Sequence, residues 1–339
     1  MRYVTMIMDF QYGSTGKGLI AGYLAKRRKY DTAVCAFSTN AGHTYIDDSR
    51  GIKMMTQQLP TSIVSDDVKT VLIGPGAAIS EEVLIAELDR YDYMMRGKRL
   101  LIHPHALVVD DAHINKELKG GYTKIGSTAK GVGEAYIQRI RRNPDDLNTV
   151  KARWGAGHPF HDFVATDKQY RDAVDAAGGM IVEGAQGFSL SVYHGQYPYT
   201  TSRDVTPWQI GADCAIPFGA ASKMEVIGTL RTLPIRVNNR DGSSGPCYPD
   251  QMELSWDDVG MTPELTTVTK LPRRIFTFSF QQLKEALWHC GGIETHLFLN
   301  FMNYISLEQQ HILLDGIATV GGEVAWAGFG PDDSDVEEL

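Results

Sequence analysis

The sequence predicts an α/β fold in which helices flank a large, mostly parallel central sheet. Short apolar runs bounded by glycine and proline recur along the chain and are typical of buried strands. Helical patterns lie between these runs, and such alternation predicts a parallel sheet that is covered on both faces. The expected strands are residues 4–8, 71–73, 100–102, 180–182, 224–230 and 297–299.

The helical patterns carry recognisable boundary signals. Ser80 precedes the second helix and is a suitable N-cap, because its hydroxyl can accept a hydrogen bond from a backbone N–H of the first turn. Gly291 and Gly292 follow the third helix, where glycine readily adopts the left-handed conformation of a helix end. The expected helices are residues 19–28, 81–91 and 281–290.

The chain shows no internal repeat and no Pro/Ser-rich linker. We therefore expect a single domain over residues 1–331, with long functional loops that include the irregular stretches 143–160 and 238–249. Residues 332–339 contain five acids among eight residues. This acidic tail is expected to be a frayed, solvated end.

Composition and charge limit the class of protein. The 33 basic and 41 acidic residues give a formal net charge of -8, which argues against a general nucleic-acid binder. The N-terminus lacks a secretory signal, and no uncharged run approaches a membrane span, so a cytoplasmic protein is expected. No C-x-x-C pair occurs, which predicts neither a disulfide framework nor a zinc site for the cysteines. These are Cys35, Cys214, Cys247 and Cys290.

A glycine-rich loop follows the first predicted strand directly. Residues 11–18 read Gln-Tyr-Gly-Ser-Thr-Gly-Lys-Gly, and a helix comes next. Glycines let backbone N–H groups approach a phosphate, the helix N-terminus adds partial positive charge, and Lys17 can reach a phosphate oxygen. The loop departs from the standard P-loop, since Gln11 and Gly18 stand where that motif has glycine and Ser or Thr. A phosphate cradle is the favoured interpretation, and a purely structural turn is the alternative.

Five motifs in this order resemble those of the adenylosuccinate synthetase family. The family's Q-W-G-D-E-G-K-G corresponds to residues 11–18, and its I-G-T-T-G-R-G-I-G to residues 125–133. N-A-G-H-T is intact at 40–44, E-G-A-Q-G is intact at 183–187, and H-G-T-Y-P-F-V-T-S corresponds to 194–202. The resemblance implies a P-loop-NTPase-like adenylosuccinate synthetase fold. It also implies a carbon–nitrogen ligase that phosphorylates purine O6 and then displaces the phosphate with aspartate.

The resemblance implies a donor site and a catalytic set. The catalytic residues would be Ser14, Lys17, His43 and Gln186, with His43 donating a hydrogen bond to the transferring phosphoryl group. Mg²⁺ would be ligated by Ser14 and the carbonyl of Gly42. The residues expected to bind the ATP or dATP donor are Gly13, Ser14, Thr15, Gly16, Lys17, Gly18, Gly42, His43, Thr44, Asn303, Gly330 and Pro331.

The resemblance also implies two sites for the other substrates. Thr269 and Arg273 would bind the carboxylates of aspartate. Arg142 would reach the acceptor nucleotide from the neighbouring subunit of a homodimer. The residues expected to hold that nucleotide are Ser14, Asn40, Ser127, Thr128, Arg142, Gln186, Thr201 and Ser202.

Three departures from the family pattern point to a particular branch. Ser14 replaces the aspartate that deprotonates N1 of IMP, and its smaller neutral side chain leaves room for a 2-amino group on the purine. Asn303 replaces the guanine-reading aspartate, which favours an adenine nucleotide as donor. Leu271 replaces an arginine expected at the ribose 2′-OH, which suggests a deoxyribonucleotide acceptor. Together these features resemble the shortened phage branch, which makes 2-amino-2′-deoxyadenylosuccinate from dGMP, aspartate and ATP, toward 2-aminoadenine DNA.

Two alternatives stay open from the sequence. One is a conventional enzyme that acts on IMP with GTP. The other is a catalytically inactive nucleotide-binding protein, although pure binding would not require a phosphoryl-transfer histidine at His43.

Overall fold

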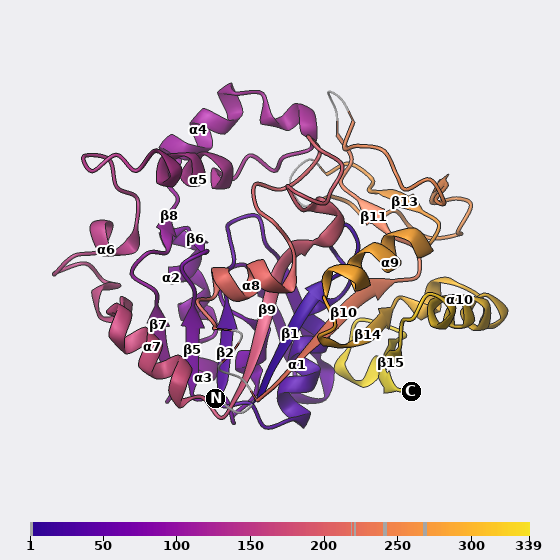
Figure 1. Ribbon diagram of the computed structural model, residues 1–339, viewed down its shortest axis with the longest axis horizontal. Coiled ribbons are helices and arrows are strands. Elements are labelled where there is room, and N and C mark those ends of the chain that lie inside the picture. Colours follow the sequence, from indigo (N-terminus) through magenta and orange to yellow (C-terminus); the bar gives the residue numbers. More distant parts are fainter. Residues whose placement is uncertain (1–2, 218, 220–221, 240–242, 267–269) are drawn as a thin grey trace.

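A computed structural model of the protein describes residues 3–217, 219, 222–239, 243–266 and 270–339, and its centre is a nine-stranded sheet (Figure 1). The strand order is β16-β15-β14-β10-β1-β9-β2-β5-β7. Neighbouring strands are parallel, except that β16 runs antiparallel to β15. The strands are Tyr3–Asp9 (β1), Thr32–Cys35 (β2), Thr70–Ile73 (β5), Arg99–Ile102 (β7), Gly179–Gly187 (β9), Lys223–Arg231 (β10), Glu294–Asn300 (β14), Val324–Gly328 (β15) and Val336–Glu338 (β16).

This sheet confirms the predicted α/β class. All the predicted strands lie in it, whereas β2, β15 and β16 were not expected from the sequence. Three smaller sheets lie outside it. They pair β3 (His43–Asp47) with β4 (Ile52–Thr56), β6 (Ala78–Ile79) with β8 (Leu107–Val108), and β13 (Arg274–Phe276) with both β11 (Ile235–Arg236) and β12 (Glu253–Leu254).

The helices connect and cover the strands. Ser80 Oγ accepts a hydrogen bond from the backbone N–H of Val83 at 3.4 Å, which confirms the predicted N-cap. Gly291 has a φ of 61°, as expected for the end of the third predicted helix. The helices are α1 (Lys17–Arg27), α2 (Glu81–Arg90), α3 (Asp92–Met95), α4 (Asp111–Lys119), α5 (Val132–Arg141), α6 (Val150–Arg153), α7 (Asp167–Ala176), α8 (Pro207–Asp213), α9 (Phe280–His289) and α10 (Leu307–Thr319).

Strand β1 shows how the core forms on both faces of the sheet. Val4, Met6 and Met8 pack in a cluster with side chains from α7, α8, α9 and α10. Ile7 points the other way, into a cluster that includes residues of α1 and α2. Successive side chains of a strand alternate between faces, so a wholly apolar strand is stable only when both faces are covered.

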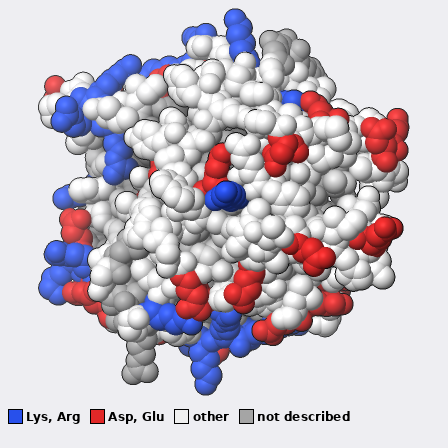
Figure 2. Space-filling view, turned by 45° about the vertical axis from the view of Figure 1, so that its right-hand side comes forward, with Lys and Arg blue, Asp and Glu red and all other residues white. Residues whose placement is uncertain are grey.

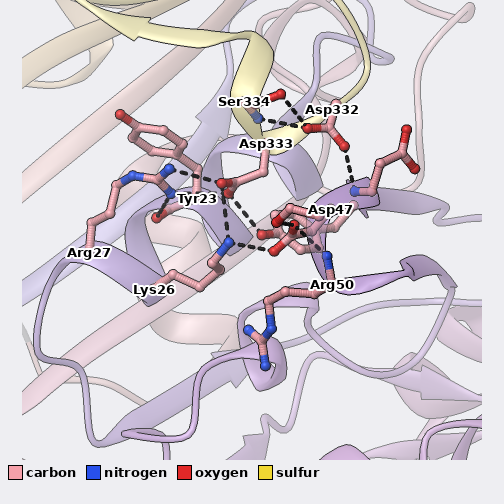
Figure 3. Close-up of polar contacts among 11 residues, drawn as sticks. Tyr23, Lys26, Arg27, Asp47, Arg50, Asp332, Asp333 and Ser334 are labelled. Atoms are coloured by element: carbon pink, nitrogen blue, oxygen red, sulfur yellow. Dashed lines mark hydrogen bonds and ion pairs between the residues drawn. The ribbon is translucent and has the colours of Figure 1, made fainter.

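The C-terminal residues are part of the fold, so the prediction of a frayed acidic tail is wrong. Strand β16 pairs with β15, and Asp333 is buried (Figure 3). The Asp333 carboxylate accepts hydrogen bonds from Arg27 at 2.8 Å and from Lys26 at 3.2 Å, both on α1. It also accepts one from the Tyr45 hydroxyl at 2.8 Å. One of the five tail acids, Asp333, pairs with cations of the first helix, whereas Glu337 and Glu338 are exposed.

Charge is unevenly distributed over the surface. On the face shown in Figure 2, acidic side chains gather on the right-hand side and toward the bottom, whereas basic ones lie mostly along the left, top and lower edges. In the part of the chain that the structure describes, no helix is long and apolar enough to span a bilayer.

Candidate active site

The candidate site lies at the carboxyl edge of the central sheet. The glycine-rich loop follows β1, Gln186 lies near the end of β9, and the segment with Asn40 follows β2. Arg231 and Asn300 are the last residues of β10 and β14. Loops at the carboxyl ends of adjacent parallel strands converge, which is where ligands bind in open α/β sheets.

The glycine-rich loop adopts a conformation that few residues tolerate. Gly13, Ser14 and Gly16 have φ values of 97°, 58° and 94°. A Cβ on Gly16 would collide with the side-chain amide of Asn300, so this position requires glycine for space as well as for backbone conformation. Ser14 is exposed at the tip, and α1 begins immediately after Gly16. The loop thus presents an exposed hydroxyl and a helix N-terminus, as expected for a phosphate cradle.

Asp9 holds this loop in place through its carboxylate. No role for Asp9 was predicted from the sequence. Its fully buried carboxylate accepts hydrogen bonds from the backbone N–H groups of Gln11 at 2.8 Å and Gly13 at 3.2 Å. It also accepts one from the Thr15 hydroxyl and lies 3.3 Å from Nζ of Lys17. A lone acid at the end of an apolar strand, directly before a glycine-rich loop, was the available signal.

The motif at residues 40–44 packs against the start of α1, directly after the glycine-rich loop. A Cβ on Gly18 would lie 2.8 Å from the carbonyl oxygen of Thr44 and 3.0 Å from Cβ of His43, so glycine permits this close approach. His43 is only 5% exposed, and its ring centroid lies 4.3 Å from that of Phe37. Gly42 is exposed beside it. The structure therefore places His43 against the first turn of α1, with Gly42 exposed next to it in the chain.

Glu183 fixes the orientation of the histidine. Oε2 of Glu183 lies 3.1 Å from Nδ1 of His43. The same carboxylate accepts hydrogen bonds from the Ser62 backbone N–H at 2.9 Å, the Ser62 hydroxyl at 2.8 Å and the Thr61 hydroxyl at 3.1 Å. Because both oxygens act as acceptors, Nδ1 of His43 carries the hydrogen that it donates to Glu183. Glu183 lies in the motif at residues 183–187, but no role for it was predicted from the sequence.

The environment of His43 also sets its protonation. Burial lowers its pKa from the usual 6.5, and the charge of Lys17 lowers it further, while the hydrogen bond to Glu183 acts in the opposite direction. The neutral ring therefore dominates near neutral pH in the absence of an anion. Its free Nε2 then carries a lone pair, and a nearby phosphoryl group would favour protonation there.

The expected acceptor-nucleotide residues come from six separate places in the chain, at residues 14, 40, 127–128, 142, 186 and 201–202. Oδ1 of Asn40 is buried and has no hydrogen-bond partner among the described residues, so it can accept from a ligand. The Thr39 hydroxyl donates to the carbonyl of Lys130 at 2.9 Å, which ties the Asn40 segment to the one that contains Ser127 and Thr128.

Two further expected residues lie on the loop after β9. Thr201 is half-buried, with its backbone N–H donating to the carbonyl of Leu190 at 2.7 Å, and Ser202 is exposed beside it.

Arg142 differs from all of the other expected acceptor-nucleotide residues in its position. It is exposed at the far end of α5, a 10-residue helix of about 15 Å that starts beside the Thr128 segment.

Gln186 occupies a strained backbone position. Its φ is 66° although it is not glycine, and the pairing of β1 with β9 shifts register beside it. A Cβ on the following Gly187 would collide with the backbone of the glycine-rich loop at Gln11 and Gly13. Such strain persists where surrounding contacts enforce it and is common at functional sites.

The expected donor-base segments follow two neighbouring strands. Asn303 is exposed in the turn after β14, and Pro331 is exposed in the loop after β15, where a Cβ on Gly330 would collide with the Asp335 carboxylate. Because β14 and β15 pair, their carboxyl ends bring these segments to the same region of the sheet edge.

One of the two expected aspartate-binding residues can be placed. Thr269 lies outside the described residues. Arg273 is half-buried, and its backbone N–H donates to the carbonyl of Glu264 at 2.7 Å. Burial lowers the pKa of Arg273, the Glu264 carboxylate raises it, and the charge of Arg231 lowers it.

Comparisons with known proteins agree with this geometry. The adenylosuccinate synthetase family model matches residues 6–149 and 148–303. The N6-succino-2-amino-2′-deoxyadenylate synthase of Salmonella phage PMBT28 is 44% identical, in an alignment that covers 98% of this chain and 96% of the relative. The adenylosuccinate synthetase of Pyrococcus horikoshii is 32% identical over 282 residues, which span 82% of this chain and 78% of the relative.

A solved structure extends the similarity to the whole fold. It is the succinoaminodeoxyadenylate synthetase of cyanophage S-2L, bound to dGMP and to dATP as an energy donor. It matches with a TM-score of 0.92 and 42% identity, and the match covers 100% of this chain and 95% of that one. The chain described here belongs to the adenylosuccinate synthetase family.

Proposed function

We propose that the protein joins L-aspartate to C6 of dGMP at the expense of ATP or dATP, releasing phosphate and 2-amino-2′-deoxyadenylosuccinate. The observation that carries this proposal is Ser14, an exposed, uncharged side chain at the tip of the phosphate loop. Family members that act on IMP have an aspartate there, as the motif comparison implied. The full-length similarity to phage enzymes named for a 2-amino-2′-deoxyadenylate product supports the same substrate.

The reaction requires two displacements. O6 of the purine first attacks the γ-phosphorus of the donor, and the nucleoside diphosphate leaves. The aspartate amine then attacks C6, and phosphate leaves with the C–O bond electrons. Both steps depend on positioning and on stabilising developing negative charge more than on covalent help from protein.

The residues of the site fit these tasks. The backbone of the glycine-rich loop and Lys17 would hold the donor phosphates, and Nε2 of His43, once protonated, would donate to the transferring phosphoryl group. Gln186 would contact the purine near its reacting edge. Asn40, whose buried Oδ1 has no partner among the described residues, would help to bind the acceptor together with Thr128.

A divalent cation fits the donor side of the site. The Gly42 carbonyl and the Ser14 hydroxyl are exposed oxygen ligands, a type that suits Mg²⁺ when phosphates and water complete its coordination. When bound, the ion would neutralise phosphate charge.

We further propose that the protein acts as a homodimer in which Arg142 of one subunit reaches the acceptor phosphate of the other. Its exposure at the far end of α5 supports this arrangement. Mixing an Arg142→Ala subunit with a Lys17→Ala subunit should restore activity that neither variant has alone. Recovery at no mixing ratio would contradict a shared site.

The proposed function is tested by phosphate release from a matrix of IMP, GMP and dGMP against ATP, dATP and GTP, each with aspartate and Mg²⁺. We expect phosphate release when dGMP is combined with ATP or dATP. This release should require aspartate. Turnover of IMP with GTP, but none of dGMP, would identify a conventional enzyme. Tight nucleotide binding without release under every combination would identify an inactive binding protein.

A further inference from the structure

Arg231 contacts three segments of the candidate site at once. Its side chain is fully buried, and Nη1 donates to the carbonyl of Ser14 in the glycine-rich loop at 3.2 Å. Its guanidinium carbon lies 3.8 Å from the ring centroid of Phe301, in the donor-base segment after β14. Nη2 lies 2.5 Å from Oε1 of Glu264, and Nη1 lies 3.4 Å from Oε2, so the ion pair is two-pronged.

The backbone of Arg231 is fixed to the glycine-rich loop. Its N–H donates to Oε1 of Gln11 at 3.0 Å, and Nε2 of Gln11 donates to its carbonyl at 3.2 Å. Gln11 is itself only 1% exposed. The guanidinium group therefore extends from a rigid point beside the phosphate cradle.

Glu264 connects this point to the aspartate-binding segment. Its carbonyl accepts the backbone N–H of Arg273, and Leu265 forms an antiparallel bridge with Pro272. These two contacts pair residues 264–265 with residues 272–273, so Arg273 lies beside Glu264. The Glu264 carboxylate, whose side chain is 30% exposed, also accepts a hydrogen bond from the Tyr304 hydroxyl at 3.3 Å.

The position of the Arg231 guanidinium depends on Glu264. Nε of Arg231 is buried and finds no acceptor within the described part of the chain. Of the groups it does contact, the Ser14 carbonyl and the Phe301 ring are neutral, so Glu264 supplies the compensating charge. A buried ion pair of this kind often adds little to stability compared with well-packed apolar residues. Its place beside the rings of Phe301 and Tyr304, and its contacts with two segments of the candidate site, point to a positioning task.

We propose that the Arg231–Glu264 ion pair is a positioning element that docks the aspartate-binding segment onto the glycine-rich loop and so sets the affinity for aspartate. The inference rests on the proposed function, because it assumes that Arg273 binds an aspartate carboxylate. Neither residue of the pair is assigned a catalytic role. The pair would instead hold Arg273 in place. Arg273 would then bind aspartate so that the aspartate amine can reach C6 of the purine.

The test compares Glu264→Gln with a matched control, Glu253→Gln. Glu253 forms a more exposed ion pair, 2.6 Å long, with Arg274, the residue after Arg273. We expect Glu264→Gln to raise the KM for aspartate by about tenfold or more, because the buried guanidinium of Arg231 would lose its charge partner and Arg273 would no longer be held in place. The Kd for dATP should change by less than about threefold, because the glycine-rich loop keeps its own contacts. Glu253→Gln should leave the KM for aspartate unaltered.

A double variant distinguishes a loss of aspartate binding from a loss of folding. In Arg231→Met/Glu264→Met the buried charges are removed together, which preserves stability better than removing one of them. A folded double variant with a raised KM for aspartate supports the proposal. An unchanged KM for aspartate in Glu264→Gln or in the folded double variant overturns it, even if the melting temperature falls. The proposed function itself would be overturned by a different result. That result is that the unaltered protein shows no aspartate-dependent phosphate release.

Discussion

Nδ1 of His43, on strand β3, lies 3.1 Å from Oε2 of Glu183, on strand β9. The two residues are 140 positions apart in the chain. Glu183 holds the ring in one orientation and one tautomer, so that Nε2 is the nitrogen left for a ligand. Such partners of a functional histidine commonly matter almost as much as the histidine.

Glu183→Gln should lower kcat about 10²-fold, because an amide cannot accept all the hydrogen bonds that converge on this carboxylate. The Kd for dATP should stay within about threefold of the original, since the phosphate loop is untouched. Adding Glu183→Gln to a His43→Ala background should cause little further loss if Glu183 acts through the ring. Independent, multiplicative losses in the double variant would contradict this coupling.

His43 should produce opposite pH dependences in stability and in catalysis. Its pKa in the folded protein lies below the usual 6.5, so the folded state binds fewer protons than the unfolded state. Stability should therefore be lost as the pH falls from the unfolded pKa toward the folded one. If the imidazolium donates to the phosphoryl group, kcat/KM should instead fall as the pH rises through the folded pKa.

Rate profiles and melting temperatures measured from about pH 5 to about pH 9 check this prediction. His43→Asn should flatten both curves. A kcat/KM that is independent of pH over this range would exclude the protonated ring as the donor.

Ser14→Asp should reduce kcat/KM for dGMP by about 10- to 100-fold, because the carboxylate would crowd the 2-amino group of guanine. The fold should tolerate the change. Ser14 is exposed, and its φ of 58° lies in the left-handed region that aspartate accepts more readily than most residues. Assays with dGMP and with the same nucleotide lacking the 2-amino group provide the comparison. Improved turnover of dGMP would refute the role given to Ser14.

Asp9→Asn should weaken dATP binding by about tenfold, because the new amide would direct a donor toward Lys17 and the Thr15 hydroxyl. Asp31→Asn is a suitable control. Asp31 likewise accepts a backbone hydrogen bond, from Gly178 at 2.7 Å, but it lies at the amino end of β2. Calorimetric titration with dATP should detect weaker binding for the first variant only. Equal affinities in both variants would mean that Asp9 does not shape the phosphate loop.

Asp333→Asn should destabilise the protein at neutral pH by about 1–3 kcal/mol, since the partner Arg27 is partly exposed. Burial alone would raise the pKa of Asp333, but hydrogen bonds and ion pairs with Arg27, Tyr45 and Lys26 hold it below its usual range. The stabilisation is therefore present above the unfolded pKa and lost as the pH falls through the lowered one.

Denaturant unfolding at several pH values measures this effect. The difference between Asp333→Asn and the unaltered protein should shrink in acid. Asp92→Asn, which breaks an exposed ion pair at the start of α3, should change stability by less than about 0.5 kcal/mol. A pH-independent difference for Asp333→Asn would argue against the ion pairs as its cause.

Local patterns in the sequence determined the α/β class, the helix boundaries at Ser80 and Gly291, and the glycine-rich loop at residues 11–18. These features depend on side-chain period, capping and backbone conformation, which act over a few neighbouring residues. The motifs likewise indicated the family, and the substitution at Ser14 indicated its branch. The C-terminal acids, by contrast, were misjudged from composition alone.

Only the tertiary structure decided which distant side chains meet. Asp333 reaches Lys26 across 307 positions, and Glu183 reaches His43, because helix α1 packs against strand β3, strand β9 and the turn at residues 333–335. The Arg231–Glu264 pair depends in the same way on Glu264 lying beside the end of β10. Periodicity and propensity carry no information about such contacts, since their energies arise from burial and charge compensation in the assembled sheet.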